Sequence, residues 1–381
     1  MAIQARSPHF ESVSVSSLSY GILKIYIWTG DKNTDVPTNP EYTIRKSATT
    51  PTTGNPRVTF EVAELIRDFL DIEFDGNYSG QGVWVRFELN GYDSSDVSII
   101  NYAYTIDSFD GYEYFEEVFT ASPLMITNRK LFVLEDNTFR VPIYTNSSPT
   151  VTFLKDNEVV GTTSFTQSDE SSEQIKYVSI YGDDTNWDSF KERVLENGGT
   201  DYESNKCLEA YFNDYSIGAV DKIIVSDSGG IKTINVSILE ECKYEPKKVT
   251  FVNKYGALQD MYFFKKSVES MNIKKESYKS NILGYDGTYS TSNHVNRDFN
   301  VVGKESVTLS SGFLSEEYNE VFKQMMLSEK VWITNVTESG EQVLPINVKT
   351  GDITYKTSLN DKLVQYTIEF DKSFDTINNI R

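Results

Sequence analysis

Short stretches in which apolar and polar residues alternate recur along most of the chain. In residues 20–28, Leu23, Ile25 and Ile27 fall on one face of an extended strand, and a mixed set falls on the other. One apolar face and one mixed face are typical of an antiparallel strand in a β-sandwich. Clusters of Gly, Pro, Asn and Asp separate these stretches and predict turns. The pattern predicts a mainly β protein with several antiparallel β-sandwich domains and a few short helices.

Helical spacing of apolar residues is limited to three short segments, residues 61–74, 186–199 and 315–330. The third lies between strand-like stretches in the last third of the chain. Ser315 is expected to be its N-cap, because a serine hydroxyl accepts a hydrogen bond from a free N–H group of the first turn. Phe322 is expected on its buried face. This part of the chain therefore predicts a sheet covered by one helix.

The order of these segments predicts three domains. Residues 1–122 are expected to form an N-terminal β-rich domain, residues 123–245 an immunoglobulin-like β-sandwich, and residues 246–381 a C-terminal sheet with one helix. The immunoglobulin-like interpretation depends on strand spacing alone. Residues 274–300 are polar, show no clear periodicity and are too long for an ordinary connection. We expect them to form an arm or a flexible loop.

Composition limits the partners of the chain. Its 381 residues carry a formal net charge of −20, which disfavours non-specific binding to nucleic acids or anionic membranes. No apolar stretch is long enough to predict a membrane span, and the N-terminus lacks the apolar core of a signal peptide. Two cysteines, Cys207 and Cys242, are too few for a disulfide framework and are expected to be reduced. We expect folding in a cytoplasm, with neither a specific nucleic acid nor a membrane as partner.

No motif supplies a group placed for catalysis. His9 and His294 have no second His or Cys at metal-ligand spacing, and neither lies in the context of a nucleophile elbow. Gly80 and Gly82 begin like a dinucleotide-binding fingerprint, but a strand follows them where that motif needs a helix. We therefore expect no catalytic residue, no cofactor, no metal and no enzymatic activity.

The densest group of acids lies at residues 107–117 and does not have the alternating spacing of a calcium-binding loop. It is interpreted as a solvated acidic loop. Its members are Asp107, Asp110, Glu113, Glu116 and Glu117.

One segment reverses the acidic balance. Residues 243–279 contain nine lysines interleaved with tyrosines and phenylalanines. Three interpretations stay open: contact with nucleic acid, a docking face for an acidic neighbouring subunit, and lysines that protect an exposed strand edge. The docking interpretation extends to tyrosines further along the polar arm, because tyrosine offers a large contact area at a low entropy cost. It gives these candidate subunit-interface residues: Lys265, Lys266, Lys274, Lys275, Tyr278, Lys279, Tyr285 and Tyr289.

Four stretches of the chain resemble a known family. The runs are LSSGFLSEEYNEVFKQMMLSEKVWITN at 309–335, YKTSLNDKLVQYTIEFDKSFDTINNIR at 355–381, KVTFVNKYGALQDMYFFKKS at 248–267 and DGYEYFEE at 110–117. They are similar to neck and tail proteins of crAss-like and related Bacteroidetes phages, most clearly over the last 140 or so residues. The resemblance implies a structural protein of the virion, assembled in the host cytoplasm as a closed ring between the portal and the distal tail of a short-tailed phage. Its implied partners are further copies of itself and other neck, tail or portal proteins.

Two other functional classes remain as alternatives to a virion structural protein. A β-sandwich with Tyr- and Asn-rich loops could instead bind a surface glycan or a receptor. An enzyme is the third class, and no recognisable chemical motif favours it. A ring protein should assemble, whereas a glycan binder should stay monomeric and retain affinity for a polysaccharide.

Overall fold

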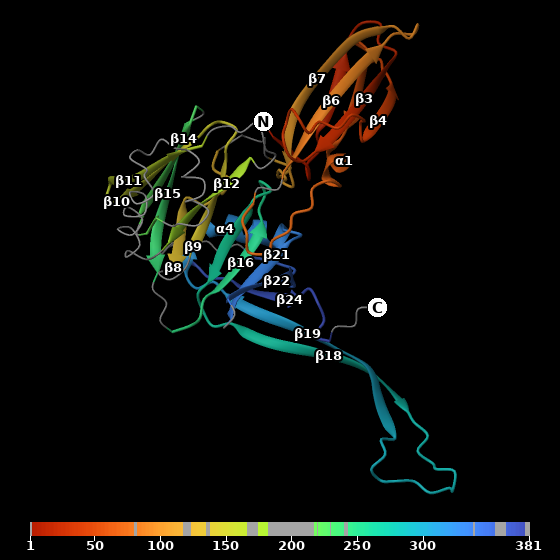
Figure 1. The fold of residues 1–381 in the computed structure, drawn as a ribbon, viewed down its shortest axis with the longest axis vertical. Coiled ribbons are helices and arrows are strands. Elements are labelled where there is room, and N and C mark those ends of the chain that lie inside the picture. Colours follow the sequence, from red (N-terminus) through yellow and green to blue (C-terminus); the bar gives the residue numbers. More distant parts are fainter. Residues whose placement is uncertain are drawn as a thin grey trace. The chain divides into compact units, whose positions relative to one another are not determined.

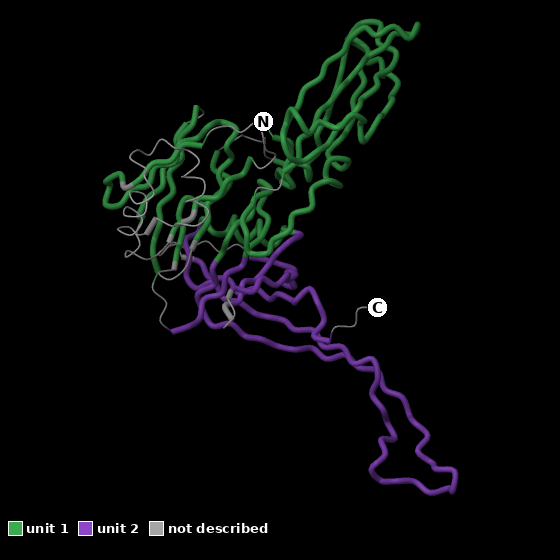
Figure 2. The backbone as a smooth tube through the Cα atoms, in the orientation of Figure 1, with its two compact units in different colours: residues 1–241, 250–261, 317–328 green, residues 242–249, 262–316, 329–381 purple. Residues whose placement is uncertain are grey.

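A computed structural model describes residues 2–79, 82–116, 123–134, 138–165, 174–181, 217–218, 220–228, 230–239, 243–337, 340–354 and 363–377. The described residues are mainly β and include two α-helices, as the sequence predicts. The chain divides into two compact units (Figure 2). The first contains residues 1–241, 250–261 and 317–328, and the second contains residues 242–249, 262–316 and 329–381.

The N-terminal part of the first unit is a β-sandwich with one large and one small sheet. The five-stranded sheet has the order β1-β7-β6-β3-β4, and a two-stranded sheet, β2-β5, packs against it. All pairings in these sheets are antiparallel except that of β1 with β7. The strands are β1 (Ile3–Gln4), β2 (Phe10–Ser14), β3 (Tyr20–Trp28), β4 (Tyr42–Ser47), β5 (Arg57–Glu61), β6 (Val83–Tyr92) and β7 (Ser98–Phe109).

The core of this sandwich follows the alternation in the sequence. Leu23, Ile25 and Ile27 of β3 are buried, as predicted. They lie in one apolar cluster with Phe60 of the small sheet. The helix predicted in residues 61–74 is present but short: α1 (Ala63–Arg67) places Ile66 in the same cluster.

Two further sheets in the first unit have the orders β11-β10-β14-β15-β8 and β13-β12-β9. Strands β10 and β11 form a hairpin in which Asp156 and Asn157 have the positive φ angles (52° and 64°) of a tight turn. Strands β14 and β15 form a second hairpin. The helix expected in residues 186–199 lies outside the described residues. The strands are β8 (Lys130–Leu134), β9 (Thr138–Tyr144), β10 (Thr150–Lys155), β11 (Glu158–Ser164), β12 (Ile175–Tyr181), β13 (Ile217–Gly218), β14 (Lys222–Asp227) and β15 (Gly230–Leu239).

The largest sheet has seven strands in the order β17-β16-β21-β22-β24-β19-β18. The division between the two units falls within β16 and β17, and the other five strands belong to the second unit. Val307 and Leu309 of β19 pair with Phe370 and Ile368 of β24, and all four are buried. The strands are β16 (Lys247–Val252), β17 (Leu258–Phe263), β18 (Val268–Lys279), β19 (Asn296–Ser310), β21 (Val331–Thr337), β22 (Gly340–Val348) and β24 (Thr367–Lys372); a separate short pair joins β20 (Leu314–Ser315) and β23 (Leu363–Val364).

The helix predicted in residues 315–330 is α4 (Tyr318–Leu327), and it belongs to the first unit. The prediction that Ser315 caps it is wrong. Ser315 pairs in β20, and the N-cap is Glu317, whose side chain makes no capping hydrogen bond. The helix is fixed by its side chains: the amide N–H of Phe132 donates to the Tyr318 hydroxyl over 3.2 Å, and Phe322 is fully buried.

Replacing Phe322 by alanine should lower the free energy of unfolding by about 3–5 kcal/mol, because a fully buried aromatic side chain leaves a cavity. Chemical denaturation of the two proteins measures this difference. Leu327→Ala in the same helix is the matched control, since Leu327 is 49% exposed and its truncation should cost far less. A loss below about 1 kcal/mol for Phe322→Ala would contradict its place in the core.

Candidate assembly surface

Strands β18 and β19 form a long hairpin that leaves the sheet of the second unit. They pair from Val268 with Thr308 to Lys279 with Asn296, but β19 pairs with β24 only through residues 306–310. Beyond that point no third strand joins the hairpin, and its contacts with the rest of the unit include the hydrogen bond that the Thr376 N–H donates to the Gly303 carbonyl over 2.8 Å and the Lys372–Glu305 ion pair. Figure 1 shows the hairpin extending away from β22 and β24, with the segment between β18 and β19 at its far end.

The hairpin exposes apolar side chains. All twelve residues of β18 and the first six of β19 are exposed. Ile273 is 59% exposed, and Met271, Tyr278 and Phe299 are about half exposed. Contiguous exposed apolar patches on a protein surface mark interaction sites.

Few interactions inside the hairpin hold it. Lys275 Nζ lies 2.6 Å from a carboxylate oxygen of Asp298, and the rings of Tyr278 and Phe299 meet edge to face at 5.6 Å. An exposed ion pair contributes roughly 0.2–1 kcal/mol. An isolated two-stranded hairpin is only marginally stable in water. The hairpin therefore gains its main stabilisation from the sheet at its base and from any surface that covers it.

A bulge divides the hairpin into two parts. Lys274 pairs with Val302 and Glu276 with Phe299, so β19 uses one residue more than β18 over this interval. Asn300 takes up the extra residue with a φ of 49°. Because side chains alternate between faces, the insertion reverses the face of every following residue of β19. On β18, Met271 and Ile273 lie on one face near the base and Tyr278 on the other near the tip, and the insertion puts Phe299 of β19 on the face of Tyr278.

Six of the eight predicted interface residues lie in this hairpin. Lys274, Lys275, Tyr278 and Lys279 are on β18, and Tyr285 and Tyr289 are in the exposed connection to β19. Lys265 and Lys266 come before β18; Lys266 is exposed, whereas Lys265 is half-buried.

Residues 274–300 were predicted to form an arm or a flexible loop, and both ends of that range are paired strands of the hairpin. Three apolar members of the hairpin were not predicted as interface residues: Met271, Ile273 and Phe299. The spacing of Val268, Met271 and Ile273 was a weak signal, because no partner strand could be assigned to it.

The aromatic residues of the basic segment 243–279 divide into two groups. Tyr262, Phe263 and Phe264 are buried in or next to β17 and belong to the core. Tyr278 is exposed on the hairpin. Only the hairpin part of this segment therefore offers both lysines and an exposed aromatic ring to a partner.

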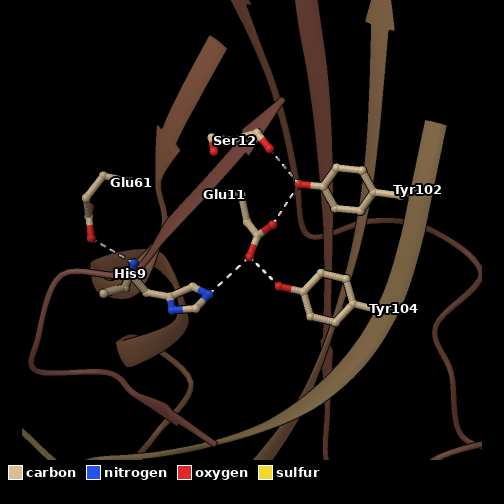
Figure 3. Close-up of polar contacts among 7 residues, drawn as sticks. His9, Glu11, Ser12, Glu61, Tyr102 and Tyr104 are labelled. Atoms are coloured by element: carbon tan, nitrogen blue, oxygen red, sulfur yellow. Dashed lines mark hydrogen bonds and ion pairs between the residues drawn. The ribbon is translucent and has the colours of Figure 1, made fainter. Parts of the chain in front are cut away.

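Apart from the hairpin, a cluster of polar side chains lies inside the N-terminal sandwich (Figure 3). The carboxylate of Glu11 on β2 accepts hydrogen bonds from the hydroxyls of Tyr102, over 2.9 Å, and of Tyr104, both on β7. His9 Nε2 lies 3.1 Å from the same carboxylate, and Glu11 is only 5% exposed. Burial alone would raise the pKa of Glu11, but the hydrogen bonds from His9, Tyr104 and Tyr102 outweigh it and lower the pKa.

The tyrosines of this cluster remain protonated donors. Burial, together with the hydrogen bond to Glu11, raises the pKa of both Tyr102 and Tyr104 far above its ordinary value. The cluster thus ties β2 to β7 through charge-assisted hydrogen bonds. It presents no activated nucleophile, so we assign it to the stability of the sandwich.

The interpretation of residues 107–117 as a solvated acidic loop is wrong for two of its members. Asp107 and Asp110 are buried, with 2% and 7% exposure. The Tyr144 hydroxyl donates to Asp107 over 2.6 Å, and Arg67 lies 3.6 Å from Asp110. Burial raises the pKa of Asp107, and the bond from Tyr144 opposes this shift. Glu117 lies outside the described residues.

Comparison with known proteins adds no assignment: no model of a known protein family matches the chain, and neither does any curated protein. Among the described residues, no group of three His, Cys, Asp or Glu side chains is arranged to hold a metal ion. Within the same residues, no helix is long and apolar enough to span a membrane. Both cysteines lie outside this part of the chain.

Replacing Glu11 by glutamine should destabilise the protein by about 1.5–3 kcal/mol at neutral pH, the range for hydrogen bonds to a charged group. Because the folded pKa is lowered, the carboxylate stabilises the fold at pH values above its ordinary pKa of 4.5. That stabilisation is lost as the pH falls through the folded pKa.

Denaturation of wild type and Glu11→Gln between pH 2 and 7 measures both effects, with the exposed Glu41→Gln as control. The difference between wild type and Glu11→Gln should shrink in acid. A pH-independent difference would contradict the role of the Glu11 charge.

Limited proteolysis should cut the isolated chain within residues 280–295, because this connection is exposed and its hydrogen bonds join only residues of the connection itself. The same bonds should survive in an assembled particle, where a neighbour covers them. Mass spectrometry of the fragments identifies the sites. Equal cleavage in free and assembled protein would argue against a covered hairpin.

Proposed function

We propose that this chain is a structural protein of a virion, which assembles with copies of itself into a closed ring in the neck or tail of a short-tailed phage. The observation that carries this proposal is the β18–β19 hairpin, with apolar side chains exposed on both faces. The resemblance to neck and tail proteins of crAss-like phages supplies the biological setting. The ring would lie between portal and distal tail and would form in the host cytoplasm.

The energetics of the hairpin favour assembly. Burial of apolar surface contributes roughly 25 cal/mol per Å², and an aromatic side chain offers 150–250 Å². The exposed Met271, Ile273, Tyr278 and Phe299 gain this energy only when another surface covers them. A protruding element that contacts the next copy is a common basis of head-to-tail contacts, and such contacts close into rings when their rotation permits.

The charge of the hairpin is compatible with a neighbour of the same sequence. Residues 274–300 carry four cations against three carboxylates, in a chain with a net charge of −20. The arm can therefore approach an acidic copy without strong repulsion. The acidic balance also disfavours capture of nucleic acid, so we propose neck, tail or portal proteins as the other partners.

The exposed connection between β18 and β19 supports one alternative. Tyr285 is fully exposed and Tyr289 is 66% exposed, among Ser and Asn residues. Amphipathic aromatic rings of this kind also suit a glycan or receptor surface. In that case the hairpin would bind a cell-surface molecule, and the chain would stay monomeric.

Sedimentation and negative-stain imaging of the purified chain, alone and mixed with neck and portal proteins, test the proposal. We expect closed rings, and we expect loss of rings when residues 272–302 are replaced by a short Gly-Asn turn. A trimmed chain that keeps its thermal unfolding transition shows that only assembly was affected. A full-length chain that stays monomeric in every mixture would refute the ring, and retained affinity for a polysaccharide would favour the alternative.

A further inference from the structure

A groove lies on the large sheet of the second unit, at the foot of the hairpin. It has a volume of about 250 Å³ and extends across the strands from β16 to β18. Its apolar lining comes from Met271, Val307, Ile333 and Ile346. Pairing places Met271 opposite Glu305 and Ile346 opposite Lys372, which in turn bonds to Glu305, so these side chains share one face of the sheet. The groove is therefore continuous with the apolar base of the hairpin.

The tip of the hairpin carries an exposed aromatic pair on the face opposite the groove. Tyr278 and Phe299 form an aromatic pair beyond the bulge at Asn300, about half exposed. Because they lie on the face opposite the groove, the pair is directed away from the groove of its own chain. We propose that the groove of one copy receives the Tyr278–Phe299 pair of the next copy; this inference deepens, and rests on, the proposed ring.

The size of the groove suits this occupant. An apolar protein cavity of about 150 Å³ holds a benzene molecule. A groove of about 250 Å³ therefore has room for an aromatic ring. Insertion would cover Met271 and the exposed aromatic pair in one contact.

The charges around the two surfaces are complementary. In the groove, Lys372 is paired with Glu305, and Lys247 lies 2.8 Å from Glu245. Glu269 also lines the groove and has no ion-pair partner among the described residues. This leaves one uncompensated negative charge in the groove.

The face of the tip that carries the aromatic pair has a net positive charge. Lys274 and Arg297 flank the aromatic pair on that face, with Glu276 as the only carboxylate beside them. Within the described part of the chain, neither cation has an ion-pair partner. Docking of the tip would bring a net positive face to Glu269, which favours this orientation over a tip-to-tip contact.

The proposed contact is heterologous, because two different surfaces of the chain meet. Each copy then offers one tip and one groove, and the copies continue in one direction until the ring closes. This property distinguishes the proposed contact from that of a symmetric dimer, in which the same patch of each copy would meet.

Two variants test the pairing: Phe299→Glu disables the tip, and Met271→Glu disables the groove. Both side chains are about half exposed, so both variants should fold, which circular dichroism and thermal unfolding check. Each variant alone should assemble roughly 30-fold more weakly or worse, the effect of losing a residue in an interface hot spot. Val97→Glu, at a similarly exposed apolar position, is the matched control and should assemble as wild type does.

The mixture of the two variants gives the decisive result. The Met271→Glu copy keeps a working tip and the Phe299→Glu copy keeps a working groove, so the mixture should form a dimer that cannot grow. Sedimentation and native mass spectrometry would detect one copy of each. A second pair, Glu269→Lys and Arg297→Glu, should fail alone, but their mixture should assemble beyond a dimer, because the reversed charges of the two variants also complement each other.

The outcomes separate the two proposals. If wild type forms rings while both variants also form rings, or while their mixture yields no dimer, the tip-in-groove contact is refuted and the ring stands. If wild type stays monomeric at all concentrations and with neck and portal proteins, both are refuted. Rings of wild type together with dimers of the mixed variants support both.

Discussion

A pair of β-strands with no third strand and no covering layer cannot bury the side chains of either face. This constraint governs the β18–β19 hairpin, in which residues 296–305 of β19 pair with β18 and with no other strand. Native proteins usually shorten or charge such edges. Here the lysines of β18 protect its edge while Met271, Ile273 and Tyr278 remain exposed on its faces. A partner surface would bury these side chains, and this is the basis on which we propose assembly as the function.

The rest of the second unit holds the base of the hairpin in place. Strand β19 begins in the hairpin and ends in the sheet, so its buried Val307 and Leu309 anchor the exposed half. Asp371 of β24 accepts a hydrogen bond from Ser306 over 2.6 Å and lies near Lys304 and Lys349. Burial opposes the charge of Asp371, but these partners prevail and lower its pKa. The junction is thus fixed by packing on one face and by ionic contacts on the other.

Strands could be predicted from the sequence, but the contacts between residues distant in the chain could not. Alternation located β3 and its buried face, because the period of two is a local property. It failed for Asp107 and Asp110, whose burial depends on Tyr144 and Arg67, distant in sequence. It failed for Ser315, because pairing with Leu363 competes with capping and wins. The ends of the hairpin were missed because neither strand has a buried face from which a period could be recognised.

The bulge at Asn300 connects the geometry of one chain to the form of an assembly. In a regular register Phe299 would lie opposite Ser277, on the same face as Met271, while Tyr278 would stay on the other face of β18, so the aromatic pair would not form. With the bulge, Phe299 lies beside Tyr278 on the face opposite the groove. In the proposed contact a neighbour can therefore be added without inversion, and its own tip remains free for the next copy. A one-residue irregularity in a strand thus creates the aromatic surface on which the proposed head-to-tail contact depends.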